Sequence, residues 1–125
     1  MSRIAVFLYG LTSGGAPRRA LALAEHFAAR GHPVDLVVAR ADGPLRDRVP
    51  GSVRLVELGG LTGRIPILRD YRPLRSHAVT FALRDYLARE RPAVLMSGAN
   101  SGHLAAVWAR DGAGVPTRLV LRVCT

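Results

Sequence analysis

The residues best suited to chemistry lie near the amino terminus, where a glycine-rich turn at residues 10–15 (GLTSGG) precedes Arg18 and Arg19. Gly14 and Gly15 can adopt positive φ and let a ligand approach the backbone closely. Free N–H groups at the start of the following helix favour a phosphate or a carboxylate, and the arginines add positive charge there. The pattern predicts an anion-binding corner, and the alternative is a tight turn that binds nothing.

The spacing of these glycines argues against two common nucleotide sites. It does not match G-x-G-x-x-G, and no acidic residue clearly ends the next apolar segment. A nucleotide-dependent oxidoreductase domain is therefore the least favoured hypothesis. The turn is not a P-loop either, because that motif needs a lysine. All 18 basic residues of this chain are arginines.

A second group of polar residues occupies positions 97–103 (SGANSGH), directly after an apolar segment. Ser97 and Asn100 are candidate substrate ligands there. His103 is a candidate catalytic residue, because it could donate a hydrogen bond to an anion or act as a general base. In the alternative reading, Asn100 or Ser101 caps the next helix and His103 is simply exposed.

A third group, at residues 61–75, places Arg64, Arg69 and Arg72 among leucine, isoleucine and tyrosine. Such a mixture can bind an anionic membrane surface or a charged acceptor. The alternative is a solvated loop.

The composition narrows the classes of partner. A formal net charge of +9 favours phosphates or anionic lipid. Nucleic acid is not expected, because aromatic residues are few and no helix-turn-helix or zinc-ligand spacing is present. No spacing of histidines or carboxylates suggests a metal site. The single cysteine, Cys124, and the lack of a signal-peptide pattern favour a reducing, cytoplasmic setting.

Five apolar segments predict the strands that position these groups, at residues 4–9, 34–39, 53–58, 93–97 and 118–123. The first is continuously apolar, as in a strand buried on both faces. Helical periodicity covers residues 17–30, with Gly31 as its C-cap, residues 76–89, and a third stretch after residue 101. In the third helix, Leu104, Val107 and Trp108 fall on one apolar side, and Trp108 is expected in the core.

The alternation of strands and helices predicts a single α/β domain built on a doubly wound parallel sheet of order 3-2-1-4-5. Ligands of such sheets bind beyond the carboxyl ends of the strands, near the switch point. The first and fourth strands border that point. The turn at residues 10–15 and the loop at 97–101 are therefore the first places to look for a site.

Two stretches are more specific than the rest, residues 13–24 (SGGAPRRALALA) and 27–38 (FAARGHPVDLVV). Together with residues 91–97 and 114–122, they resemble the amino-terminal domain of family 4 glycosyltransferases. Members of that family are retaining enzymes of the GT-B architecture, with a cleft between two Rossmann-like domains. The resemblance implies a Rossmann-like fold and the transfer of a sugar from a nucleotide-sugar.

The resemblance also implies roles for individual residues. Gly14 and Gly15 would face the donor diphosphate, with Arg18 beside them. No metal ion or other cofactor is implied, because backbone dipoles and cations can stabilise the leaving phosphate. Pro17 stands where many members carry glutamate, and Cys124 falls where many carry a site histidine at the end of the fifth strand.

The leading hypothesis is that residues 1–125 form the acceptor-side domain, which meets a glycan or a lipid-linked acceptor. The carboxy-terminal donor-binding domain would then be absent, and the domain is expected to be inactive without it or a partner subunit. Peripheral contact with the inner face of the membrane is compatible with this hypothesis. The alternative is a stand-alone module that binds anionic lipid or a donor-binding subunit.

Overall fold

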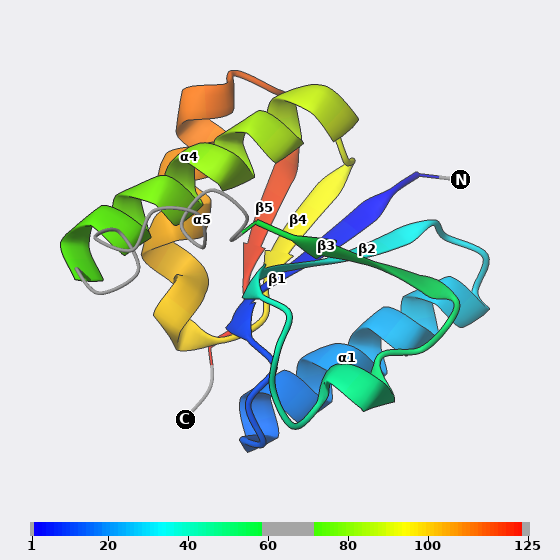
Figure 1. Cartoon of the computed structure of the whole chain (residues 1–125). Coiled ribbons are helices and arrows are strands. Elements are labelled where there is room, and N and C mark those ends of the chain that lie inside the picture. The colour runs from blue at the N-terminus through cyan, green and yellow to red at the C-terminus, as the bar shows by residue number, and fades with distance from the viewer. Residues whose placement is uncertain (1, 59–71, 124–125) are drawn as a thin grey trace.

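Figure 1 shows the computed structural model, which describes residues 2–58 and 72–123, apart from the side chains of residues 72–77 and 101. Its centre is a five-stranded parallel sheet of order β3-β2-β1-β4-β5. The strands are β1 (Ile4–Gly10), β2 (Val34–Arg40), β3 (Val53–Glu57), β4 (Val94–Ser97) and β5 (Arg118–Leu121). The predicted doubly wound, Rossmann-like fold and its strand order are confirmed.

Helices cover both faces of this sheet. Helix α1 (Gly15–Ala29) lies on one face, and α4 (Arg72–Glu90) and α5 (His103–Ala113) lie on the other (Figure 1). Short 3-10 turns, η1 (Arg46–Arg48) and η2 (Asn100–Gly102), follow β2 and β4. None of the helices in the described residues combines the length and the hydrophobicity needed to cross a bilayer.

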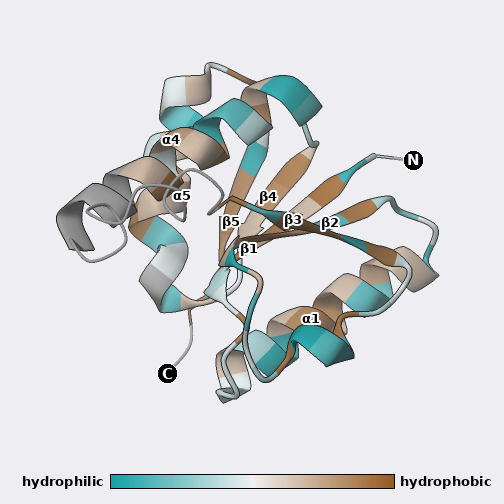
Figure 2. Ribbon diagram, viewed as in Figure 1, coloured by the Kyte–Doolittle hydropathy of each residue, from teal (hydrophilic) through white to brown (hydrophobic). Residues whose placement is uncertain are grey.

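The alternation of side chains along β1 builds a core on each face of the sheet. Ala5 and Phe7 pack toward α4 and α5, whereas Val6 and Leu8 pack toward α1. All four side chains are buried, and complete burial of a large apolar side chain stabilises a fold by about 2 kcal/mol. Figure 2 shows the strands as the most apolar part of the ribbon. The continuous apolar sequence of β1 therefore corresponds to a strand buried on both faces, as predicted.

Several boundaries differ from the sequence predictions. Helix α4 begins at Arg72 rather than at residue 76, since a proline at position 73 is tolerated in a first helical turn. Strands β4 and β5 are each shorter than predicted. Arg64 and Arg69 lie outside the described residues, so the predicted anionic-surface segment at residues 61–75 is described only from Arg72 on, and there only for the backbone at the start of α4.

Helix α5 turns a different face to the core than its sequence predicts. Its buried residues are Ala105, Ala106 and Ala109, whereas Leu104 and Trp108 are 58% and 53% exposed. Small alanines allow α5 to pack close to α4 and the sheet, and a tryptophan at this contact would force the helices apart. The prediction that Trp108 is a core residue is wrong.

Glycine ends α1 and α5 as helix-termination rules predict. Gly31 has φ 94° and Gly114 has φ 64°, both in the left-handed region that residues with a Cβ rarely adopt. The C-cap of α1 is Arg30 rather than the predicted Gly31, and Gly31 follows it as the left-handed residue that leads from α1 into β2.

Candidate functional site

The candidate site lies at the carboxyl edge of the sheet, where β1 and β4 end side by side (Figure 1). Helix α1 begins after β1, and η2 and α5 begin after β4, on the opposite face. The N–H of Gly98 donates to the carbonyl of Phe7 (2.9 Å), so the loop after β4 stays attached to β1. This edge is the switch point of the sheet. Both predicted site loops therefore meet there.

The glycine turn presents unpaired backbone donors at the start of α1. Gly14 is the N-cap, with no side-chain cap, and the first helical hydrogen bond runs from the N–H of Arg18 to the carbonyl of Gly14 (3.3 Å). Pro17 has no N–H. Within the described residues, the N–H groups of Gly15 and Ala16 have no hydrogen-bond partner. These donors and the helix dipole together favour an anion.

The conformational reason predicted for the glycines is wrong. Gly14 has φ −65°, and Gly15 is not among the residues with positive φ. Packing does not require glycine either. A Cβ at Gly14 would meet only the Pro17 ring at 3.6 Å, and one at Gly15 would meet the flexible end of Arg19 at 3.1 Å. What glycine provides here is an open backbone surface that a ligand can approach closely.

Arg18 and Arg19 leave positive charge at this helix end without a compensating carboxylate. Both side chains are exposed, and the first turn of α1 contains no acidic residue. Among the described residues, neither forms an ion pair. Cations at a helix amino terminus oppose the helix dipole. An external anion at this position would relieve that repulsion.

The loop after β4 orders Ser97 and His103 but leaves Asn100 exposed. Ser97 is fully buried, and its Oγ lies 2.7 Å from Nδ1 of His103. Gly102 is the N-cap residue of α5, whereas the alternative prediction placed Asn100 or Ser101 at that position. His103 is half-buried rather than simply exposed.

Two glycines in this loop are explained by close packing. A Cβ at Gly98 would lie 3.0 Å from both the Ala20 Cβ and the Leu8 Cδ2, and a Cβ at Gly102 would lie 2.9 Å from the Phe7 ring. These contacts press the loop against β1 and α1. They fix its position relative to the glycine turn.

Arg122 lies at the candidate site, and sequence reasoning did not single it out. Its guanidinium Nη1 donates to the carbonyl of Gly98 (2.9 Å) and to the carbonyl of Ala16 (3.5 Å). Its backbone N–H donates to the carbonyl of Ser97 (3.0 Å). Arg122 therefore joins the loop after β4 to the first turn of α1. The only sequence signal was its position at the end of the fifth predicted strand.

Comparison with known protein families classifies the chain. The family model of the glycosyl transferase 4-like domain matches residues 14–124, which is most of the sequence. The chain belongs to this family. A comparison with curated proteins gave no significant match.

The remaining predicted site features of this glycosyltransferase 4-like domain have different outcomes. Cys124 lies outside the described residues, so its place in the site stays a prediction. In the parts of the chain that are described, no group of histidine, cysteine and carboxylate side chains is arranged to hold a metal ion.

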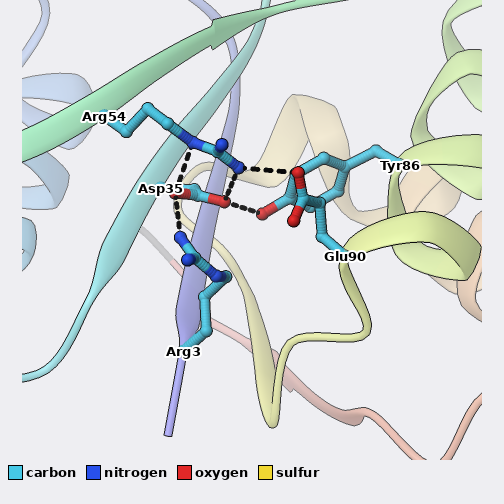
Figure 3. Close-up of polar contacts among 5 residues, drawn as sticks. All are labelled: Arg3, Asp35, Arg54, Tyr86 and Glu90. Carbon is cyan, nitrogen blue, oxygen red and sulfur yellow. Dashed lines mark hydrogen bonds and ion pairs between the residues drawn. The ribbon is translucent and has the colours of Figure 1, made fainter. Parts of the chain in front are cut away.

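A second polar cluster lies at the opposite edge of the sheet, around Asp35 of β2 (Figure 3). Asp35 is fully buried and accepts hydrogen bonds from Arg3 (2.7 Å), from Arg54 (2.8 and 3.0 Å) and from the hydroxyl of Tyr86. Arg54 also donates to Glu90 (2.9 Å). The cluster ties β2, β3 and the residue before β1 to α4, and we assign it a structural role.

Opposing effects set the pKa of the Asp35 carboxyl. Burial alone would raise this pKa, but hydrogen bonds from Arg54 and Tyr86 and the positive charges of Arg3 and Arg54 outweigh burial and lower it. Burial and the hydrogen bond to Asp35 raise the pKa of Tyr86. Asp35 is therefore ionised throughout the neutral range, and Tyr86 keeps its proton.

The lowered pKa of Asp35 predicts acid sensitivity. The unfolded chain, with a pKa near 3.8 at this position, binds the proton before the folded domain does. The stability contributed by ionised Asp35 is complete above that pH and is lost as pH falls through the lower folded-state pKa. Urea midpoints measured across this acid range should fall more steeply for wild type than for Asp35→Asn. Equal slopes would contradict the assignment.

Proposed function

We propose that this glycosyltransferase 4-like domain receives the diphosphate of a nucleotide-sugar at the amino terminus of α1 and presents a glycan or lipid-linked acceptor to it. The observation that carries the proposal is the open backbone at Gly15 and Ala16, whose N–H groups are unpaired among the described residues. Membership of the family supports sugar transfer at a coarse level.

Sugar transfer from a nucleotide-sugar requires stabilisation of the leaving phosphate. Transfer breaks the bond between the anomeric carbon and the diphosphate, and negative charge develops on the departing oxygen. Preorganised N–H donors and cations near that oxygen lower the barrier, and loss of one such donor typically costs about 3 kcal/mol. Gly15 and Ala16 would supply donors, and Arg18 and Arg19 would supply charge. The proposal needs no metal ion.

A second protein surface is required to shield this site from water. Gly14, Gly15, Arg18 and Arg19 are all exposed, so a diphosphate bound there would keep much of its hydration. Hydrogen bonds and charges act more strongly where water is excluded. We therefore assign most of the nucleotide surface to a second domain or a partner subunit, and we expect the domain alone to bind weakly and not to turn over.

The test is nucleotide binding by the 125-residue chain, followed through its backbone amide NMR signals, with UDP, GDP and inorganic pyrophosphate as probes. We expect the amide signals of Gly15 and Ala16 to move with at least one probe. Gly15→Val should weaken that binding about tenfold or more, because its methyl groups cover donors that form charge-assisted hydrogen bonds. Added salt should weaken binding further.

Gly51→Val is the matched control, because a Cβ at Gly51 meets nothing within 4 Å. The control should bind each probe as wild type does. Unchanged affinity in Gly15→Val, or signal changes confined to other parts of the domain, would exclude the helix terminus as the diphosphate site.

A further inference from the structure

The pair formed by Ser97 and His103 takes no part in the diphosphate binding proposed above. Nδ1 of His103 lies 2.7 Å from Oγ of the buried Ser97. Nε2, on the other side of the ring, is covered by surrounding atoms and has no hydrogen-bond partner. A buried polar atom left unpaired costs about 1–3 kcal/mol, so an orphaned nitrogen in a native site calls for an explanation.

The hydrogen bonds of Ser97 bear on which ring nitrogen of His103 carries the proton. The hydroxyl of Ser97 donates to the carbonyl of Ala99 (3.5 Å). A hydroxyl has one proton, so while Ser97 donates that proton to Ala99, its Oγ can only accept from Nδ1–H of His103. In the neutral ring, the lone pair is left on Nε2.

We infer that Ser97 is a positioning residue that holds His103 as the Nδ1–H tautomer, and that Nε2 accepts a hydrogen bond from a hydroxyl group of the acceptor sugar. This inference rests on the proposed function, because it takes the domain as the acceptor side of the enzyme. A bare nitrogen attracts a hydroxyl proton and repels the oxygen of an ionised phosphate. The pair therefore selects the acceptor hydroxyl over the donor phosphate.

The position of His103 suits this role. It is the first residue of α5, at the same edge of the sheet as the glycine turn, and Gly102 before it is pressed against the Phe7 ring. The side chain is only half-buried, although Nε2 itself is covered. A hydroxyl therefore needs a local movement of the covering atoms to reach Nε2, and catalytic hydrogen bonds commonly tighten only in the complex.

The tautomer can be measured without a ligand, by long-range proton–nitrogen NMR of the neutral imidazole rings in the full chain. The chain has 4 histidines, and His103→Gln assigns the signals of interest by their loss. We expect protonated Nδ1 and bare Nε2 in wild type, and a shift toward the Nε2–H form in Ser97→Ala. His26→Gln, on the exposed side of α1, should leave these signals unchanged. A wild-type Nε2–H tautomer would overturn the inference.

Ligand selectivity is tested with methyl α-D-glucoside, methyl α-D-mannoside and methyl α-D-galactoside against inorganic phosphate. We expect at least one glycoside to move the Nε2 signal of His103 and phosphate to leave it in place. Movement with phosphate alone, or with no probe, overturns the inference. The diphosphate site is judged separately from the amides of Gly15 and Ala16, so failure of the proposed function and failure at His103 are distinguishable.

Discussion

Replacing Asp35 with asparagine should destabilise the domain by about 3 kcal/mol at neutral pH, because a buried carboxylate with several donors loses its charge. Asparagine keeps the volume of the side chain, so the loss is not a cavity effect. Its amide nitrogen would face groups that also donate, namely Arg3, Arg54 or Tyr86. The fully buried Tyr86 hydroxyl has no route to water.

The size of this effect is limited by the exposure of the arginines. The Arg3 and Arg54 side chains are 33% and 51% exposed, so both can recover hydration when Asp35 is replaced. For that reason we place the loss at about 3 kcal/mol, at the low end for a broken buried ion pair. In a thermal melt this corresponds to about 10 °C.

Asp42→Asn is the matched control. Asp42 pairs with Arg40 at 3.1 Å, but both side chains are more than half exposed. An exposed pair of this kind contributes less than about 1 kcal/mol. The urea denaturation midpoints of Asp35→Asn and Asp42→Asn should therefore differ clearly. Equal stability losses would show that burial of Asp35 adds nothing to its ion pairs.

Gly102→Ala should destabilise the domain by about 2 kcal/mol, the cost of overpacking a rigid contact. The added Cβ would lie 2.9 Å from Cε2 and 3.1 Å from Cδ2 of Phe7, whose ring is fully buried. The change from glycine to alanine by itself usually stabilises a protein by about 0.5 kcal/mol through the unfolded chain. The steric cost is larger than this stabilisation, so Gly102→Ala is expected to lower the stability of the domain.

Gly51→Ala separates these two terms, since a Cβ there meets nothing within 4 Å and the residue has no positive φ. We expect it to match or slightly exceed wild type in urea denaturation. Gly102→Ala should also move the NMR signals of the neighbouring His103 ring. Wild-type stability in Gly102→Ala would mean that the Phe7 ring gives way at little cost.

The strand order could be predicted because each strand is a short apolar run and the crossover rule leaves few arrangements. That the two candidate loops meet could be predicted, because the switch point of the sheet is a topological feature. Which side of α5 faces the core could not be predicted. Alanine and bulky apolar residues both recur along that helix, and only the close approach of α4 decides that Ala106 faces inward and Trp108 does not.

The polar contacts were beyond sequence reasoning for a different reason. Asp35 stands alone within an apolar run, which signals a buried charge, but its partners come from β3, α4 and the residue before β1. Arg122 likewise binds carbonyls distant in sequence. The glycine turn lies between β1 and α1 as predicted, but one of the two reasons given for its glycines, a positive φ, is wrong. Sequence alone could not separate the two reasons, because an open approach to the backbone and a positive φ favour the same residue type.

Arg122 also has a consequence for the order in which the site forms. Its guanidinium reaches Ala16 across 106 positions of sequence, and it follows the edge strand β5, which pairs only with β4 among the described strands. Contacts of such long range form only after a large loss of chain entropy. We therefore expect the two loops to be locked together late in folding and to be released early in local opening of the edge strand. A bound ligand that holds both loops would slow the amide hydrogen exchange of β5, although it touches no residue of that strand.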